Sequence, residues 1–356
     1  VLDPFCGVGV TIYEGLRIGR KVVGFDLNPL SIFIVKNMVR KGVNFAELES
    51  TFGKIAAYLK YLYGDYNLID FESQQKSFLK EKAGIEWNEL AFYVFCNFCG
   101  HKVLLSNENR IVNGRYSCQN SDCKGNKKNG GFIEPKNCKR DGYKYLYSVI
   151  RSPLDKRRVH IPFDEERIRI LNKHIRFLDE EIKKNKIEIK KDEIPLNWDR
   201  QHEDLLCKKG IKTFQDLFTK RNLLINCLLL NCINKLNTSK GTYEILRLVF
   251  SSSLRDTNIM SFTNDGWQSG KPTNWSKHAY WVPSQFCENN VLTSFENAFN
   301  RVRSALIFNE DSNYKLIFTE KFEDLKEGKG NLLLLNTSID EFKLPENSVD
   351  IVITDP

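Results

Sequence analysis

Short apolar runs stand near both ends of the chain and are typical of buried strands. They are Val1-Leu2, Lys21–Asp26, Leu332–Leu335 and Val349–Thr354. Helical patterns follow the first two runs, from Ile12 and from Leu30 to Arg40, the second behind Asn28-Pro29, a helix-start signal. Strands that alternate with helices predict an α/β fold on a parallel, doubly wound sheet, which binds ligands at the carboxyl ends of its strands.

The long stretch between these ends, residues 46–310, has a different pattern. It is charged over Asp164–Ile194, with apolar residues at helical spacing, and amphipathic over Phe218–Leu236, Tyr243–Leu254 and Val291–Leu306. We therefore expect a helical core within a large insert. The predicted organisation is the first part of an α/β domain (1–45), a helical connection (46–90), a cysteine-containing module (91–150), a helical insert (151–310) and the second part of the α/β domain (311–356).

The glycine-punctuated turn after Val1-Leu2 is the first candidate for chemistry. Gly7 and Gly9 remove side chains where the chain turns from strand to helix, so a ligand can approach the backbone. Asp26, at the end of the next strand, can accept both hydroxyls of a ribose, which predicts a nucleoside-containing cofactor. The third glycine of a dinucleotide fingerprint would fall on Ile12, which disfavours NAD. The alternative is a tight turn without a ligand.

Four of the ten cysteines are spaced as two metal-binding knuckles, Cys96/Cys99 and Cys118/Cys123. Four thiolates would close a tetrahedral structural Zn²⁺ site, and the eighteen residues between the pairs suit a β-hairpin. Because the second gap is wide, Cys138 or His101 is an alternative ligand. The spacing indicates metal binding in a reducing cytoplasm rather than a disulfide framework. We interpret the remaining apolar-flanked cysteines as reduced packing residues: Cys207, Cys227, Cys232 and Cys287.

Composition and charge narrow the classes of partner. The chain is 41% hydrophobic, which excludes wholesale disorder, and no apolar run approaches the ~20 residues of a membrane-spanning helix. The net charge is +8, and residues 91–151 hold eleven Lys and Arg against four Asp and Glu, a net +7. This basic segment predicts contact with a phosphate backbone, and a solvated basic face is the alternative.

Two groups of aromatic residues could either stack on the bases of a nucleic acid or pack inside the protein. Tyr143, Tyr145 and Tyr147 interleave with basic residues, and we favour packing in a small core over base stacking. The polar stretch 262–286 carries Trp267, Trp275, His278, Tyr280 and Trp281 without periodicity. It is either a surface for single-stranded or flipped bases or a loop pinned by packed tryptophans, and His278 is expected to make a structural hydrogen bond.

Both ends of the chain resemble the amino-group DNA methyltransferases. The resemblance lies in Asp3-Pro4-Phe5-Cys6-Gly7-Val8-Gly9, in Gly24-Phe25-Asp26-Leu27-Asn28-Pro29 and in the closing Asn347-Ser348-Val349-Asp350-Ile351-Val352-Ile353-Thr354-Asp355-Pro356. Together with the cysteine pairs, Leu217–Leu224, Gly266-Trp267 and His278–Trp281, these motifs are similar to the zinc-ribbon-containing adenine-specific DNA methylases. That resemblance implies a Rossmann-like methyltransferase sheet interrupted by a zinc ribbon and a helical DNA-recognition region.

The resemblance also implies a reaction and its residues. S-adenosylmethionine would bind Asp3, Pro4, Phe5, Gly7, Gly9, Asp26 and Asn28. Asp355 and Pro356 would accept hydrogen bonds from the exocyclic amine of a flipped DNA base, most simply N6 of adenine, for in-line methyl transfer. A cytosine N4 target and a catalytically inactive zinc-ribbon nucleic-acid-binding module are the alternatives. Cys6 is not expected to act as a covalent nucleophile.

The chain departs from that family's pattern at two places. The second proline and the aromatic residue of the Asp-Pro-Pro-Tyr motif do not follow Pro356, so we expect a fragment that is inactive on its own. Asn336-Thr337-Ser338 stands where the family has an acidic residue after the third strand, which puts that contact to the adenine ring in doubt, although Asp340 lies close behind. A role in restriction-modification is an expectation from the family alone.

Overall fold

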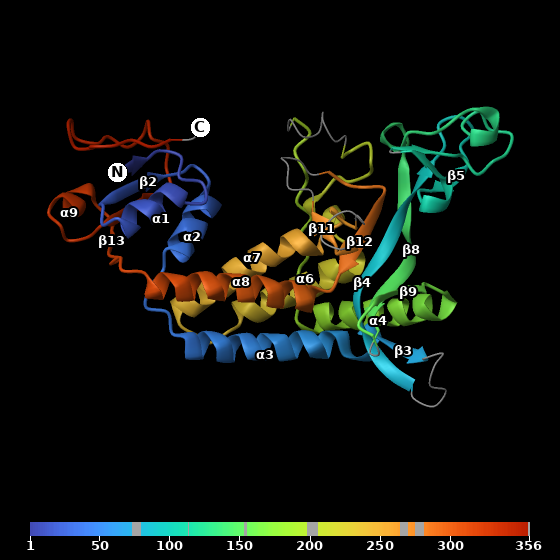
Figure 1. Cartoon of the computed structure of the whole chain (residues 1–356), viewed down its shortest axis with the longest axis horizontal. Helices are drawn as coiled ribbons and strands as arrows, with labels where there is room; N and C mark the ends of the chain where they lie inside the picture. The colour runs from blue at the N-terminus through green and yellow to red at the C-terminus, as the bar shows by residue number, and fades with distance from the viewer. Residues whose placement is uncertain are drawn as a thin grey trace. The chain divides into compact units, whose positions relative to one another are not determined.

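The computed structural model describes residues 1–72, 80–112, 114–152, 155–197, 206–263, 270–274 and 281–354 (Figure 1). The chain forms two compact units. Unit 1 contains Val1–Lys54, Leu236–Ser251 and Asn297–Pro356, and unit 2 contains Ile55–Lys235 and Ser252–Glu296. The first unit therefore combines both ends of the sequence, whereas the four boundaries between the predicted segments remain predictions.

A parallel sheet is the centre of unit 1. Its strands are β1 (Leu2–Asp3), β2 (Val22–Phe25), β14 (Leu332–Leu335) and β13 (Phe318–Thr319), and they lie in the order β1-β2-β14-β13. Residues 351–353 pair with the other side of β1, where the Leu2 N–H donates to the Ile351 carbonyl and the Ile353 N–H to the Leu2 carbonyl, both at 2.9 Å. The fold is mixed α/β with a parallel sheet, as predicted.

Helices cover both faces of this sheet because neighbouring residues of each strand point to opposite sides. Val22 and Leu332 face α1 (Val10–Arg17) and α2 (Pro29–Met38), where Ile12, Leu16 and Val35 are buried. Val23 and Leu333 face the other way, against Phe322 and Leu325 of α9 (Phe322–Lys326). The two layers explain why the strands read as continuous apolar runs in the sequence.

Side-chain hydrogen bonds join the helical parts of unit 1. The Glu47 carboxylate of α3 (Phe45–Tyr63) accepts hydrogen bonds from Thr238, Ser239 and Thr242 at the start of α7 (Lys240–Thr257). These donors, with Ser239 first, lower the pKa of Glu47 to about 2. Residues 236–251 are thus bound to the first part of the chain although the sequence separates them by about 190 residues.

An antiparallel sheet organises unit 2. The long strands β4 (Lys80–Phe95) and β8 (Arg140–Arg151) run side by side, flanked by β12 and β9, and β3 and β5 also pair with β4 (Figure 1). These flanking strands are β12 (Gln285–Asn289), β9 (Arg158–Pro162), β3 (Leu68–Glu72) and β5 (Lys102–Leu104). A helical connection was predicted for 46–90, but helix α3 ends at Tyr63 and strands occupy the region from Leu68.

Three of the predicted helices occur close to their expected positions. They are α4 (Glu165–Lys184), α6 (Lys220–Asn234) and α8 (Val291–Asp311), and α7 similarly extends the predicted 243–254 helix at both ends. The shorter elements are β6 (Arg110–Val112), β7 (Arg115–Tyr116), β10 (Ser261–Phe262), β11 (Thr273–Asn274), and the 3₁₀ turns η1 (Gly64–Asn67), η2 (Asn107–Asn109), η3 (Lys127–Asn129), η4 (Pro135–Asn137) and η5 (Phe214–Leu217). Among the helices of the described residues, none has the length and apolar character needed to cross a membrane.

Candidate functional site

The turn between β1 and α1 depends on its glycines. Gly7 and Gly9 have φ angles of 49° and 85°, in the left-handed region that favours glycine. Gly9 is the N-cap of α1, and a Cβ there would lie 2.7 Å from the Val35 side chain. A Cβ on Gly7 would meet only the Phe5 carbonyl oxygen, at 3.9 Å, so the space beside this residue is open. The turn therefore packs closely at Gly9 and leaves room for a ligand at Gly7.

Asp26 connects this turn to the end of β2. Its carboxylate accepts hydrogen bonds from the N–H of Gly7 at 2.9 Å and the N–H of Asn28 at 2.8 Å, and the Cys6 N–H donates to the Phe25 carbonyl at 2.9 Å. Asp26 is half-buried, and an ionised carboxylate can accept more hydrogen bonds than these two. The predicted ribose-binding carboxylate and the predicted glycine turn thus lie in contact.

The remaining predicted cofactor residues surround the same edge of the sheet. Asp3 is buried and accepts from the Phe5 N–H at 3.2 Å, and Pro4 lies between them. Phe5 is 53% exposed and Leu27 is 72% exposed, so apolar surface borders the turn. The side chain of Asn28 accepts from the Leu30 N–H at 3.0 Å, which makes it the N-cap of α2.

The Cys6 thiol has the properties of a packing group. Burial, followed by the negative charges of Asp26 and Asp3, raises its pKa to about 12. The thiol therefore stays protonated at neutral pH, which agrees with the expectation that it is not a nucleophile.

The closing Asp-Pro pair is only partly placed. Residues 351–353 lie beside β1, so the strand that leads to the pair runs along the strand that leads to the glycine turn. Since parallel strands end at the same edge of a sheet, Thr354 follows at the edge that carries Asp26. Asp355 and Pro356 themselves lie outside the described residues.

Asn336, at the end of β14, has a structural use that the sequence did not reveal. Its side-chain amide donates to the backbone carbonyls of Asp26 and Leu27, at 2.8 and 3.0 Å. Asn336 therefore binds the ends of two neighbouring strands together. Local sequence gives no signal for these bonds because β2 and β14 are far apart in the chain.

The second candidate site is the cysteine cluster of unit 2. The sulfur atoms of Cys96, Cys99, Cys118 and Cys123 all lie within 4.8 Å of one another. Two pairs, Cys96–Cys123 and Cys99–Cys118, are 3.6 and 3.7 Å apart. Four thiolates bound to one Zn²⁺ at ~2.3 Å would lie about 3.8 Å apart, so this donor set fits a tetrahedral zinc ion.

Backbone turns hold the cluster in place. The Gly100 N–H donates to the Cys96 carbonyl at 2.8 Å, and the Gly125 N–H donates to the Cys123 sulfur at 3.2 Å. A backbone N–H of His101 lowers the pKa of Cys99 to about 7, while burial raises that of Cys118. Strands β6 and β7 form an antiparallel hairpin between the two cysteine pairs, as predicted.

The alternative ligands lie outside the cluster. Cys138 is buried with its sulfur 3.5 Å from the Glu134 carbonyl, and the described metal-binding group does not include it. His101 contributes its backbone carbonyl, which accepts from the Cys96 N–H at 2.9 Å. The structure therefore assembles the first-choice set, with Cys123 as its fourth member.

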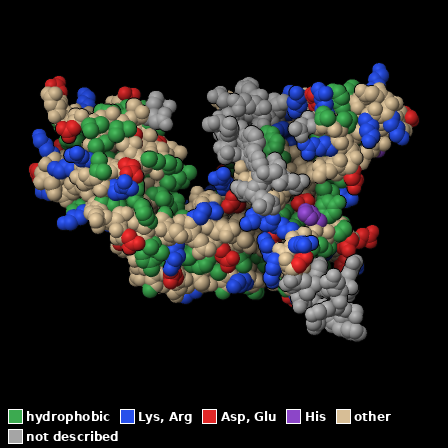
Figure 2. Space-filling model, viewed as in Figure 1, with side chains coloured by type: hydrophobic (Ala, Val, Ile, Leu, Met, Phe, Trp, Pro, Cys, Tyr) green, Lys and Arg blue, Asp and Glu red, His purple; other side chains and the backbone are tan. Residues whose placement is uncertain are grey.

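The aromatic predictions have mixed outcomes. Tyr143 and Tyr145 pack against the buried core that includes Phe92 and Phe286, which confirms the packing interpretation for both, while Tyr147 is 36% exposed. Trp281 packs edge-on against Phe262. The other predicted aromatic-loop residues lie outside the described residues: Trp267, Trp275, His278 and Tyr280. Figure 2 shows Lys and Arg side chains mixed with hydrophobic ones over the part of the molecule that carries β5.

A buried polar cluster, which was not predicted from the sequence, lies at the start of α6. Arg221 and Glu288 form an ion pair with side chains 7% and 0% exposed. Glu288 also accepts from the Tyr145 hydroxyl at 2.7 Å, from the Asn88 amide at 3.1 Å and from the Thr219 hydroxyl. The polar run Thr219–Asn222 ahead of an apolar helix was the available signal. The cluster fixes the first turn of α6 against the antiparallel sheet.

Searches against protein-family models, curated proteins and solved structures found no match to this chain.

Proposed function

We propose that this chain carries the cofactor and base-binding framework of an S-adenosylmethionine-dependent DNA methyltransferase that methylates an exocyclic base amine, adenine N6 in the first instance. The observation that carries the proposal is the strand order. The segment 351–353, β1, β2 and β14 are consecutive in one parallel sheet, with the glycine turn after β1 and Asp26 after β2. The chain order reverses at β1, which is where doubly wound sheets bind their ligands.

The residues at this edge fit the proposed cofactor. The Asp26 carboxylate would accept hydrogen bonds from the ribose hydroxyls, and the open space beside Gly7 would let the ligand approach the backbone. The exposed side chains of Leu27 and Phe5 offer apolar surface to the adenine ring and to the methylene groups of the cofactor. When bound, the cofactor would supply an activated methyl group on its sulfonium sulfur.

The base-binding residues would be Asp355 and Pro356. An exocyclic amine is a poor nucleophile because its lone pair is delocalised into the ring. The Asp355 carboxylate and the Pro356 carbonyl would accept hydrogen bonds from the amine hydrogens of a flipped base and favour a tetrahedral nitrogen. Alignment of the amine with the transferred group would supply much of the rate. The four-cysteine site would hold structural Zn²⁺ in the DNA-binding part of the protein.

Calorimetric titration with S-adenosylmethionine tests the cofactor site. We expect Asp26→Ala to weaken binding about 10- to 100-fold, because charge-assisted hydrogen bonds are worth ~1.5–3 kcal/mol. Asp324→Ala is the matched control, since this carboxylate, on α9, lies 3.8 Å from the Lys329 ammonium group. Equal affinity of the Asp26→Ala and wild-type proteins would remove the cofactor assignment.

Mass spectrometry of nucleosides from DNA incubated with the full-length protein and the cofactor tests the reaction. N6-methyladenine that disappears in Asp355→Ala supports the proposal, and N4-methylcytosine would change the target base. If the cofactor binds but no methylated nucleoside forms, the second candidate applies: a zinc-ribbon nucleic-acid-binding module with an inactive methyltransferase-like sheet. The compact cysteine cluster is the observation that supports this second candidate function.

A further inference from the structure

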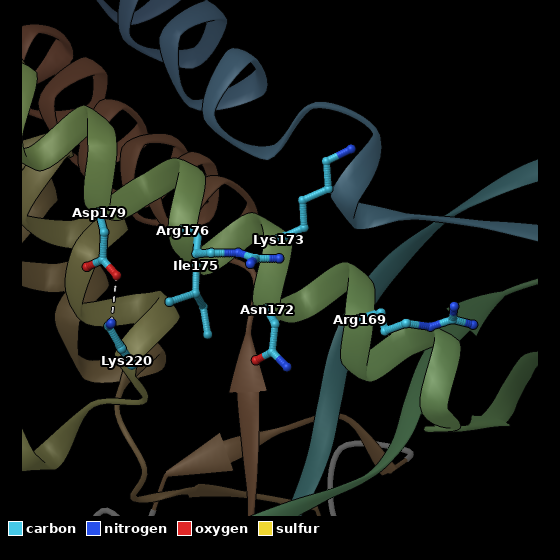
Figure 3. Close-up of a pocket in the computed structure, with 7 residues that line it drawn as sticks. All are labelled: Arg169, Asn172, Lys173, Ile175, Arg176, Asp179 and Lys220. Carbon is cyan, nitrogen blue, oxygen red and sulfur yellow. Dashed lines mark hydrogen bonds and ion pairs between the residues drawn. The ribbon is translucent and has the colours of Figure 1, made fainter.

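An open groove of about 620 Å³ runs along α4 and ends at the first residue of α6 (Figure 3). It belongs entirely to unit 2. Its lining is basic and amide-bearing, with one apolar and one acidic side chain: Arg169, Asn172, Lys173, Ile175, Arg176, Asp179 and Lys220. Four cationic groups against one carboxylate give the groove a net charge of +3.

Three of the cations are available to a ligand. Lys220 forms an ion pair with Asp179 at 2.6 Å. Arg169, Lys173 and Arg176 are exposed, and within the described parts of the chain no acidic side chain pairs with them. Between residues 167 and 178 the helix has no Asp or Glu, although it has acidic residues in its first and last turns. Positive charge is therefore concentrated on the part of α4 that lines the groove.

The spacing of these cations suits a polymeric anion. Residues 169, 173 and 176 lie four and three positions apart, so they share one face of the helix. With 1.5 Å of rise per residue, the row extends about 10 Å. Duplex DNA carries a phosphate charge for every ~1.7 Å of its axis, so such a row can contact several phosphates at once. An exposed groove with several separate cations fits a backbone better than one small anion.

We propose that this α4 groove binds the sugar-phosphate backbone of duplex DNA. Arg169, Lys173 and Arg176 contact phosphates, and Asn172 donates from its amide to the same backbone. The choice of duplex DNA as the partner rests on the proposed function, whereas the anion-binding character of the groove rests on its own residues. Phosphate contacts of this kind position the protein on DNA without reading the sequence.

The test is fluorescence anisotropy with a labelled 20-base-pair duplex of mixed sequence, over a series of KCl concentrations. For the full chain with Arg169→Ala, Lys173→Ala and Arg176→Ala combined, we expect at least ~10-fold weaker binding in low salt. The slope of log affinity against log salt should fall by about 3, close to one unit for each lost phosphate contact. Because all three side chains are exposed, circular dichroism should show an unchanged fold.

Two further variants sharpen the result. Lys183→Ala, Lys190→Ala and Lys191→Ala combined remove the same charge from exposed positions outside the groove lining and should leave the slope within about one unit. Arg169→Lys with Arg176→Lys keeps the charge and should keep the slope. An equal loss in both triple variants, no loss in the groove variant, or a preference for an RNA duplex would overturn the inference. Normal cofactor binding and methyl transfer alongside such a result would leave the proposed function intact.

Discussion

At the scale of single residues, a comparison of two glycines distinguishes the cost of a left-handed backbone from the cost of steric crowding. Gly9 and Gly19 have φ angles of 85° and 74°, so alanine is strained at both positions. A Cβ on Gly9 would lie 2.7 Å from Val35, whereas a Cβ on Gly19 would have no atom within 4 Å. The difference in stability between alanine variants at these two positions therefore measures the cost of crowding between Gly9 and Val35.

We expect Gly9→Ala to lower the free energy of unfolding by about 2–5 kcal/mol. About 1–2 kcal/mol comes from the left-handed conformation, and overpacking against Val35 adds about 1–3 kcal/mol. Gly19→Ala should show only the first contribution. Urea denaturation measures both changes, and equal losses in the two variants would mean that Val35 moves aside without cost.

Some residues of the candidate site could be predicted from the sequence, and others could not. Asp26 could be predicted as part of a site because it directly follows an apolar strand and accompanies a glycine turn. The hydrogen bonds of Asn336 to Asp26 and Leu27 could not, because they depend on a strand pairing between distant parts of the chain. The same holds for Glu288, whose burial depends on partners from three other segments.

At the scale of elements, alternation failed to reveal β4 because its pattern of buried positions is irregular. Buried apolar side chains occupy positions 83, 85 and 87 and then 90, 91, 92 and 94, and the polar side chain of Asn88 is buried as well. The pairing with β8 shifts register at three places, one of them between Glu89 and Leu90, so the buried positions do not keep a single alternation along the strand. The starts of the helices with a constant apolar stripe could be predicted to within a few residues, whereas α4 ends at Lys184, ten residues before the end of the predicted stretch.

The cysteine module predicts a stoichiometry. Metal analysis should find about one Zn²⁺ per chain, and Cys99→Ser should lower zinc retention because three thiolates and a hydroxyl hold the ion weakly. Cys138→Ser is the matched control and should retain the metal, since its sulfur lies outside the cluster. Removal of zinc with a chelator should increase amide exchange around Cys96–Cys123. A folded, metal-free preparation would exclude the zinc site.

The packing of α4 against the end of α3 predicts a pH dependence. His174 is buried and its ring nitrogen lies 2.9 Å from the Leu62 carbonyl; burial, then Arg221, lowers its pKa from 6.5 to about 4. The unfolded chain thus binds this proton at a higher pH than the folded chain. The corresponding stability is present above about pH 6.5 and is lost as pH falls towards 4, by about 3 kcal/mol.

Thermal unfolding at several pH values measures this loss. His174→Gln should reduce the fall in stability between pH 6.5 and 4 relative to wild type. His160→Gln, at an exposed position beside Glu89, should leave the fall unchanged. If the His174→Gln and wild-type profiles are parallel, the buried imidazole does not remain neutral in the folded protein.

At the scale of the whole molecule, we expect cofactor binding to protect backbone amides in unit 1 and not those in unit 2. Hydrogen exchange with S-adenosylmethionine at about 100 times its Kd should slow the amides of 3–9 and 26–28, by up to ~2.7 kcal/mol of added stability. Amides of the antiparallel sheet in unit 2 should be unaffected, and Asp26→Ala should abolish the change. Protection confined to unit 2 would place the ligand away from the parallel sheet.

The pairing of β2 with β14 has a consequence for synthesis on the ribosome. Val22 pairs with Leu332, 310 positions later. At 5–20 residues per second, roughly 15–60 s pass between the emergence of the two strands. During this interval, nascent β2 has an open edge able to pair with other chains, while the cysteine hairpin already has all its own segments. We therefore expect β1 and β2 to remain without β14 until synthesis is nearly complete, and we expect chaperones to bind them during this interval.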